Sequence, residues 1–342
     1  MLTKITLKSG ASPEKPGLSF PLTPVTVFVG PNNSGKSRAL VEIERWVTSA
    51  QAPECQVVEK IEFRAWDGAN FELELKKIAV EPHHSETINP DNVLIGKLRP
   101  QDNSAARFQI NHAGLVNEAT QPNGKYRHHY SNYLSLFTLR LDGRSRLSLI
   151  EDKPAGDLLR QASNHFAQLF VDSKSRKEVR RIVQEAFGKY LVVDPTNIGH
   201  LRLRLSSRPP EDDREEQGWD ETSRTFHAAA SLLSEASDGV KAFVGMLTTL
   251  IAGEPNVTLI DEPEAFLHPT LAARLGKEIT GALKGTDRRL FAATHSSSFL
   301  MGCVQGGAPI NIVRLTFDGE TSTARLLTQE RLIPLMRNPL LR

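Results

Sequence analysis

The chain has 342 residues, 39% of them hydrophobic and 24% charged, with a formal net charge of +2. These values fit an ordinary globular protein and exclude a global field that would require a polyanionic partner. The two distant cysteines, Cys55 and Cys303, exclude a disulfide framework, and the longest apolar stretch, Val244 to Ala252, is too short for a membrane span. We therefore expect a cytoplasmic protein with no membrane segment.

Residues 1–29 predict two or three strands broken by prolines, and the last run, Val25 to Val29, indicates a buried strand. The next eight residues, Gly30 to Ser37, match G-x-x-x-x-G-K-[ST], the phosphate-binding P-loop. Apolar residues then recur at helical spacing, which predicts a helix to about Thr48. This strand–loop–helix context favours a genuine P-loop over a glycine-rich turn that matches by chance.

A P-loop binds phosphate because its glycines let the backbone curl around an anion and point N–H groups at it. Lys36 is expected to reach the β- and γ-phosphates, and the Ser37 hydroxyl is expected to ligate Mg²⁺. The full set of candidate binding residues in the loop is Gly30, Asn32, Asn33, Ser34, Gly35, Lys36 and Ser37.

The next hundred residues carry weaker signals. Alternation over 56–80 predicts two strands joined by a hairpin at Asp67-Gly68. Residues 81–131 predict an irregular insertion with one hairpin, in which His83-His84 and His128-His129 are loop residues without metal-site spacing. Residues 134–149 predict a further hairpin at Asp142-Gly143.

Helical periodicity follows, first over Leu158 to Phe170 and then in a second helix. That second helix is predicted to start at Ser175, with Glu178 completing a capping box, and to end at Gly188. Residues 201–205 predict a half-exposed strand, and 207–220 predict a charged, proline-containing loop. The second helix begins with basic residues, for which a solvated face is favoured over contact with DNA phosphates: Lys174, Arg176, Lys177, Arg180 and Arg181.

Two strand ends in the last third carry further polar residues. The apolar run Val257 to Asp261 ends in Asp261-Glu262, where Asp261 could hold Mg²⁺ through water and Glu262 could orient and deprotonate an attacking water. The alternative is a solvated acidic turn. A third apolar strand, Leu290 to Thr294, ends in His295, which could sense a γ-phosphate by donating a hydrogen bond.

A P-loop, a strand that ends in Asp261-Glu262 and a strand that ends in Thr294-His295 together resemble the motifs of the ABC-type ATPases. That family needs a signature sequence at a helix N-terminus before the acidic strand, and the segment Leu233 to Val240 lies in that place. It keeps only Ser237 and Gly239 of the transporter signature. A Ser-Asp-Gly signature, together with the segment Glu264 to Pro269, resembles the OLD family and its relatives, soluble ABC ATPases of DNA repair and phage defence. A Q-loop glutamine is not placed; Gln101 and Gln109 are weak candidates.

The resemblance implies an α/β ABC-ATPase P-loop fold, with a mixed sheet core, an antiparallel β subdomain and a helical lobe. We divide the chain into an N-terminal ATPase half (1–150), a helical lobe with the charged loop (151–224) and a C-terminal ATPase half (225–342). The resemblance also implies ATP and Mg²⁺ as cofactors. It implies a head-to-tail homodimer, or a higher even oligomer, in which Ser237 and Gly239 of one subunit cover ATP on the other.

The C-terminal segment predicts a hairpin around Gly319 and then a tail from Leu332 to Arg342. The acidic cluster of the TOPRIM nuclease domain that follows in many OLD-like proteins is absent. Three explanations stay open: the nuclease is on another chain, the sequence is truncated before it, or the ATPase serves another effector; we expect a separate nuclease or toxin effector. The expected function is an ATPase sensor or motor in DNA repair or anti-phage defence. The alternative is an ATP-gated scaffold that holds the effector with little turnover; a membrane-transporter subunit is disfavoured by the signature.

Overall fold

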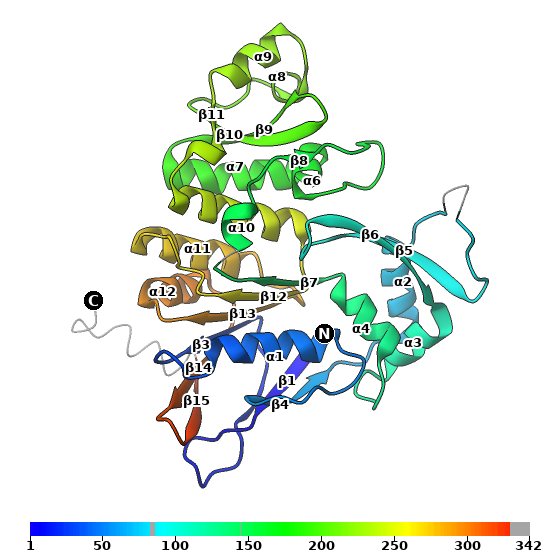
Figure 1. Ribbon diagram of the computed structural model, residues 1–342, viewed down its shortest axis with the longest axis vertical. Coiled ribbons are helices and arrows are strands. Elements are labelled where there is room, and N and C mark those ends of the chain that lie inside the picture. The colour runs from blue at the N-terminus through cyan, green and yellow to red at the C-terminus, as the bar shows by residue number, and fades with distance from the viewer. Residues whose placement is uncertain (83–85, 144, 329–342) are drawn as a thin grey trace.

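A six-stranded sheet forms the centre of the molecule, in the order β15-β14-β3-β13-β12-β7 (Figure 1). The structure is a computed structural model that describes residues 1–82, 86–143 and 145–328. Five strands are parallel and β15 alone is antiparallel. The strands are β3 (Val25–Val29), β7 (Thr138–Leu141), β12 (Val257–Asp261), β13 (Arg289–Thr294), β14 (Ile310–Phe317) and β15 (Ser322–Thr328).

Both faces of this sheet are buried, which explains why its central strands are apolar throughout. On β13, Leu290 and Ala292 face one hydrophobic cluster, while Phe291 and Ala293 face the other. The first cluster includes α10 (Asp238–Gly253), α11 (Pro269–Gly281) and α12 (Ser297–Gly306), and the second includes α1 (Lys36–Thr48). The mixed sheet core with helices on both sides is therefore confirmed.

An antiparallel sheet lies beyond α1, as predicted for the first residues. It has the order β2-β1-β4, with β1 (Leu2–Leu7) between β2 (Ser19–Pro21) and β4 (Val58–Phe63). Helix α1 contacts both β4 and the central strands β12 and β13. The P-loop helix is thus fixed between two sheets, and its predicted end at Thr48 is confirmed.

The hairpin predicted at Asp67-Gly68 is wrong, because Asp67 caps a helix instead. Its carboxylate accepts a hydrogen bond from the backbone N–H of Asn70, and α2 (Gly68–Ile78) follows. The apolar residues Phe71 and Leu75 lie one helical turn apart and are buried together. An Asp-Gly pair is equally compatible with a hairpin turn and with a helix N-cap, so this pair alone does not distinguish the predicted hairpin from the observed helix.

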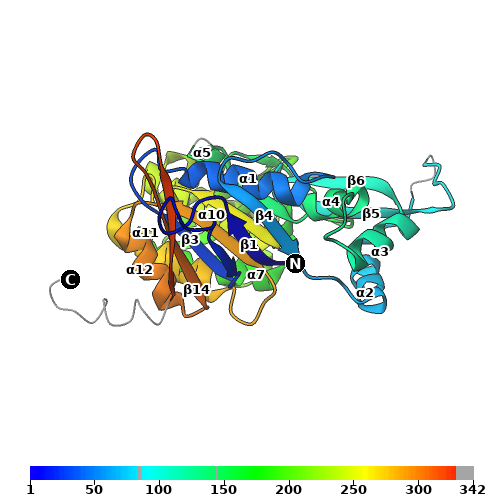
Figure 2. The same ribbon diagram turned by 90° about the horizontal axis from the view of Figure 1, so that it is seen from below.

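The insertion contains the expected hairpin and two helices that the sequence did not reveal. Strands β5 (Asn92–Arg99) and β6 (Ser104–Asn111) pair as a hairpin, and α3 (His112–Thr120) and α4 (His128–Ser135) follow. His128 and His129 therefore start a helix rather than lie in a loop, while His83 and His84 lie outside the described residues. In Figures 1 and 2, β5, β6 and α2–α4 stand to one side of the central sheet.

The second predicted hairpin, at Asp142-Gly143, is also wrong. Residues 138–141 form β7, which pairs in parallel with β12 at the edge of the central sheet. Asp142 then accepts a hydrogen bond from the backbone N–H of Ser145, which starts the short helix α5 (Ser145–Ser148).

The helical lobe lies above the central sheet in the view of Figure 1. Its first helix begins later than predicted, because Asn164 rather than Leu158 marks the start of α6 (His165–Val171). The second, α7 (Ser173–Phe187), is capped by Asp172 and not by Ser175, whose hydroxyl itself donates to Asp172. Gly188 ends α7 with φ 65°, as predicted.

Two long antiparallel strands, β9 (Tyr190–Asn197) and β10 (His200–Ser206), complete the lobe, and β10 also pairs with the short strands β8 (Lys153–Pro154) and β11 (Ser231–Leu232). The charged loop predicted at 207–220 contains a helix, α8 (Asp213–Gln217), and α9 (Glu221–Ala228) follows it. Glu216 of α8 is fully buried, and its charge is compensated by ion pairs with Arg176 and Arg180. Buried ion pairs therefore order a segment whose composition indicated a solvated loop.

The last third follows the predicted alternation of helix and strand. A short 3-10 turn, η1 (Leu233–Glu235), leads into α10, and β14 and β15 form the expected hairpin around Gly319. The tail predicted from Leu332 lies outside the described residues. The central sheet draws strands from both 1–150 and 225–342, whose boundaries remain a prediction. In the part of the chain that the structure describes, no helix is long and apolar enough to cross a membrane.

Candidate functional site

The predicted site residues gather where β3, β12 and β13 end. Register places Val29 beside Thr294, and Asp261 beside Ala293, so the three carboxyl-terminal ends meet at one edge of the sheet. This edge is where an open α/β sheet binds ligands.

The P-loop adopts a conformation that needs glycine at its first position. Gly30 has φ 149°, and a Cβ there would lie 2.0 Å from the carbonyl oxygen of Leu315. Gly35 has φ 91° and Asn33 φ 62°, both left-handed. These left-handed residues let the loop curl tightly before α1 starts at Lys36.

In the described structure, the side chains of Lys36 and Ser34 make no hydrogen bond outside the loop. The Lys36 ammonium donates to the carbonyl oxygens of Gly30, at 2.9 Å, and of Pro31, at 2.7 Å. The Ser34 hydroxyl is buried and has no hydrogen-bond partner in the described structure. Both groups could turn to a bound anion, because only the loop's own backbone competes for Lys36.

Ser37 and Asp261 lie 224 residues apart in sequence and meet at this edge. The Ser37 hydroxyl donates to Oδ1 of Asp261 over 2.9 Å. Two oxygen ligands that were predicted separately, one on the P-loop and one on the acidic strand, are therefore adjacent.

Glu262 follows in a left-handed conformation, with φ 49°, and its backbone N–H donates to the carbonyl oxygen of Ala293. Its side chain is 55% exposed, and its carboxylate lies 3.9 Å from Nδ1 of His295. The strained turn thus directs an exposed carboxylate away from the sheet, beside the predicted histidine.

Glu264 is a part of the site that sequence reasoning did not assign. Its carboxylate accepts hydrogen bonds from the Thr294 hydroxyl, at 2.7 Å, and from the His295 backbone N–H, at 3.1 Å, and it lies 3.3 Å from Nδ1 of His295. The Glu264 side chain is only 10% exposed. This carboxylate therefore connects the turn after β12 to the end of β13 and orients His295.

Arg146 of α5 is a second unassigned residue. It is fully buried and donates a hydrogen bond to the carbonyl oxygen of Asp261. Burial lowers the pKa of Arg146, and the nearby carboxylates of Glu264, Asp261 and Glu262 oppose that shift. A buried cation thus lies directly behind the acidic turn. No short sequence motif marks it, because α5 follows a strand that was itself predicted as a hairpin.

The signature residues Ser237 and Gly239 lie at the start of α10. Ser237 is the exposed N-cap, and its side chain makes no capping hydrogen bond. Gly239 packs against the turn after β12, where a Cβ would lie 2.8 Å from the carbonyl oxygen of Phe266. Among the described residues, no hydrogen bond or ion pair joins Ser237 or Gly239 to the P-loop of the same chain.

The two candidate glutamines differ in their surroundings. Oε1 of Gln101 accepts a hydrogen bond from the backbone N–H of Arg140 on β7, at 2.6 Å. Gln109 bonds within the insertion, to Asn89 and Thr87. Gln101 alone therefore contacts the central sheet, and the assignment of a Q-loop residue stays open.

Most of the basic residues at the start of α7 bind carboxylates of the protein itself. Arg176 and Arg180 pair with buried Glu216, and Arg181 pairs with Glu178, Glu185 and Glu278. Only Lys174 and Lys177 have no ion pair in the described residues. The solvated-face interpretation is thus wrong for Arg176, which is 3% exposed, and little of this run is available to DNA phosphates.

Within the described ranges, no group of three or more His, Cys, Asp or Glu side chains is placed to hold a metal ion.

Comparison with known families gives one match. Residues 122–301 match the family described as "AAA domain, putative AbiEii toxin, Type IV TA system". This match covers more than half of the chain and includes the acidic strand, the signature and His295. No curated protein matches the sequence.

Solved structures with a similar fold are SMC head domains. A crystal structure of an SmcHead bound to the C-winged helix domain of ScpA has a TM-score of 0.55 at 14% identity, covering 97% of this chain and 99% of that one. The Smc head domain from Pyrococcus furiosus, bound to the C-terminal domain of ScpA, has a TM-score of 0.51 at 13% identity, covering 98% of each chain. The chain therefore has the P-loop ATPase fold of SMC heads, as predicted.

Proposed function

The chain belongs to the AAA-domain family whose model matches residues 122–301, and from that premise we propose that it is a Mg²⁺-dependent ATPase of the ABC type. The observation that carries the proposal is the 2.9 Å hydrogen bond from the Ser37 hydroxyl to the Asp261 carboxylate. P-loop ATPases hold Mg²⁺ with such a pair, one oxygen from the loop and one from the acidic strand.

The residues present fit a nucleotide with its metal ion. The Lys36 ammonium group is held by two carbonyl groups of the loop, and the Ser34 hydroxyl is buried without a hydrogen-bond partner in the described structure. At Gly30 there is no room for a side chain. Ser37 and Asp261 would hold Mg²⁺, which when bound supplies positive charge beside the phosphate oxygens.

The other residues act on the attacking water and on the γ-phosphate. Glu262 is exposed at the acidic turn and would orient and deprotonate water. His295 would donate a hydrogen bond to the γ-phosphate, and Glu264 holds it in place through both its ring and its backbone. Lys36 would leave its loop carbonyls for the β- and γ-phosphates.

We further propose that ATP joins two copies of the chain head to tail, in a dimer or a higher even oligomer. Ser237 and Gly239 begin α10 without a side-chain cap, so the first N–H groups of this helix are free to face an anion. They make no hydrogen bond to their own P-loop, which supports a role on the ATP of a partner subunit.

The biological function proposed is that of a cytoplasmic sensor or motor in DNA repair or anti-phage defence, as in the OLD family, with a nuclease or toxin effector on a separate chain. The family's description as a toxin of a Type IV TA system supports a link to a toxin. Sequence-independent DNA binding remains a weaker part of the proposal, because Arg176, Arg180 and Arg181 are already paired.

The ATPase proposal is tested by Lys36→Ala, with Lys60→Ala on β4 as the matched control at an exposed lysine. ATP hydrolysis should fall to background in Lys36→Ala and remain unchanged in Lys60→Ala. Hydrolysis by Lys36→Ala at the wild-type rate would refute the assignment of this site.

An ATP-gated scaffold is the second candidate, favoured by the toxin in the family's description. A scaffold needs ATP binding and assembly but little turnover. Glu262→Gln should then keep partner binding and biological activity while hydrolysis is lost. Loss of all three together would exclude the scaffold and favour the motor.

A further inference from the structure

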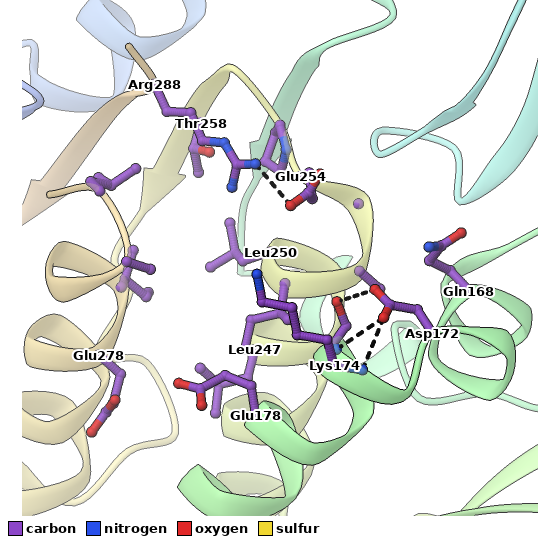
Figure 3. Close-up of a pocket in the computed structure, with 18 of the residues that line it drawn as sticks. Gln168, Asp172, Lys174, Glu178, Leu247, Leu250, Glu254, Thr258, Glu278 and Arg288 are labelled. Carbon is purple, nitrogen blue, oxygen red and sulfur yellow. Dashed lines mark hydrogen bonds and ion pairs between the residues drawn. The ribbon is translucent and has the colours of Figure 1, made fainter. Parts of the chain in front are cut away.

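A cavity of about 800 Å³ lies between the helical lobe and the central sheet (Figure 3). Its walls come from α7, α10 and α11 and from the amino ends of β12 and β13, where Thr258 and Leu290 line it. The candidate ATP site lies at the carboxyl ends of the same two strands. The volume is within the range of small-molecule pockets, about 300–1,000 Å³.

Much of the cavity wall is apolar. Leu247 and Leu250 of α10 face the cavity (Figure 3), and Ile279 of α11 and Leu290 of β13 also line it. Leu247, Ile279 and Leu290 are at most 6% exposed, so these surfaces belong to the hydrophobic core. An apolar ligand group placed here would be covered on several sides.

The acidic residues at the rim already have partners. Glu178 and Glu278 both pair with Arg181, and Glu254 pairs with Arg288 over 2.9 Å. Asp172 accepts hydrogen bonds from the first backbone N–H groups of α7. The negative charges of the cavity are therefore largely satisfied by the protein.

Two lysines of the cavity differ from these residues. In the described structure neither Lys97 nor Lys174 has a carboxylate within ion-pair distance; Lys97 lies over the Phe137 ring, 4.2 Å from its centroid. Lys174 extends its ammonium group into the cavity beside Leu250 (Figure 3). Burial lowers the pKa of Lys97 to about 8, so most of it is still charged at pH 7.

We propose that this cavity binds a small amphipathic anion: an apolar body carrying one carboxylate or phosphate group. Lys97 and Lys174 pair with the anionic group, and the apolar wall covers the body. Burial partly removes the Lys97 ammonium group from water, and although the Glu254 carboxylate opposes the fall in its pKa, no carboxylate of the described residues pairs with it. A bound anion would supply that partner, and the exposed ammonium group of Lys174 would add a second positive charge at the mouth of the cavity.

The position of the cavity makes this ligand a regulator of ATP turnover, a part of the inference that rests on the proposed function. Helix α10 lines the cavity near its C-terminus and carries Ser237 and Gly239 at its N-terminus. Strands β12 and β13 line it at their starts and end at Asp261 and Thr294. A ligand between the lobe and the sheet contacts the elements that carry the signature, the acidic turn and His295, and can bias their arrangement relative to the P-loop.

Binding is tested without nucleotide, by titrating the protein with the fluorescent probe anilinonaphthalene sulfonate, itself an amphipathic anion. We expect saturable one-to-one binding to the wild type. The double variant Lys97→Met, Lys174→Met should raise the dissociation constant at least tenfold, and Leu250→Trp, which places an indole ring in the space for the apolar body, should raise it by a similar factor. The control Lys60→Met, an exposed lysine on β4, should bind as the wild type. Equal affinity in the wild type and the double variant would overturn the proposal.

Competition then identifies the anion. Decanoate or decyl phosphate should displace the probe, and the more effective of the two names the anionic group. Decanol has the same chain without charge and should displace it at least tenfold less well; equal displacement by decanol would contradict the function of the lysines. Displacement by neither anion would also overturn the proposal.

The site and the ATPase proposal can fail independently. Lys36→Ala should bind the probe as tightly as the wild type, because the P-loop lies at the other end of the sheet. The anion that displaces the probe should change the ATP hydrolysis rate of the wild type and leave that of Leu250→Trp unchanged. Displacement of the probe with no change in wild-type hydrolysis would refute regulation while the binding site stands.

Discussion

At the scale of residues, the candidate site depends on two side chains that touch its functional groups from behind. Glu264 binds Thr294 and His295, and Arg146 binds the carbonyl oxygen of Asp261. Neither belongs to the phosphate-binding or metal-binding set. Both fix the geometry of residues that do, in the way that outer-shell partners orient the ligands of metal sites.

Glu264→Ala should lower the rate of ATP hydrolysis about tenfold to a hundredfold, with a smaller change in ATP affinity. The carboxylate holds His295 through its ring and its backbone N–H, so its loss frees the histidine while leaving the P-loop intact. Steady-state hydrolysis and binding of a fluorescent ATP analogue separate the two effects. The matched control is Glu320→Ala, in the exposed turn between β14 and β15. A loss of affinity as large as the loss of rate would contradict this function of Glu264.

At the scale of elements, buried charged and titratable groups fix the helical lobe. Glu216 of α8 pairs with Arg176 and Arg180 of α7 and accepts a hydrogen bond from the backbone N–H of Val193 on β9. Removing one partner of such a buried network leaves the others charged and unpaired.

Glu216→Ala should therefore lower the free energy of unfolding by about 3–5 kcal/mol. Urea unfolding followed by circular dichroism measures this change. Glu178→Ala removes an exposed partner of Arg181 on α7 and is the control, with an expected loss of about 1 kcal/mol or less. Similar losses from both variants would show that the buried network contributes no more than a surface ion pair.

We expect His165 to lower the stability of the folded protein in mild acid. It is 1% exposed, both ring nitrogens lack a partner in the described structure, and burial lowers its pKa from 6.5 to about 3. Below pH 6.5 the unfolded chain binds a proton that the folded chain does not, so stability falls as the pH falls from 6.5 toward 3. Between pH 7.5 and 5.5 this group should contribute a loss of about 1.4 kcal/mol.

This dependence is measured by urea unfolding at the two pH values. His165→Gln should remove that part of the pH dependence, while His200→Gln, at an exposed histidine of β10, should keep it. An unchanged pH dependence in His165→Gln would mean that the buried imidazole does not set it.

The elements that the sequence predicted best are those marked by a motif or by strong periodicity. The P-loop, α1, the acidic strand and α10 carry such signals. The hairpins predicted at Asp67 and Asp142 are wrong. An Asp followed by Gly is equally compatible with a hairpin turn and with the start of a helix, so the pair alone does not distinguish them. Glu264 and Arg146 could not be assigned to the site from sequence. Their contacts are made through space, to residues about 30 and 115 positions away.

At the scale of the whole molecule, the central sheet joins the two halves of the ATP site. Strand β3 brings the P-loop from the start of the chain, and β12 and β13 bring the acidic turn and His295 from its last third. Among the residues that the structure describes, Ser237 and Gly239 of α10 make no hydrogen bond or ion pair to this site. In the proposed ATP-joined dimer, a second copy would supply Ser237 and Gly239 to this site.

The most direct test of this account is the solution mass of Glu262→Gln, measured by light scattering with and without MgATP. The variant should bind ATP without hydrolysing it, so we expect a monomer without nucleotide and a dimer or higher even oligomer with MgATP. Adding Lys36→Ala to the same variant should prevent the shift. A mass that stays monomeric with MgATP, or that is oligomeric without any nucleotide, would contradict an ATP-joined assembly.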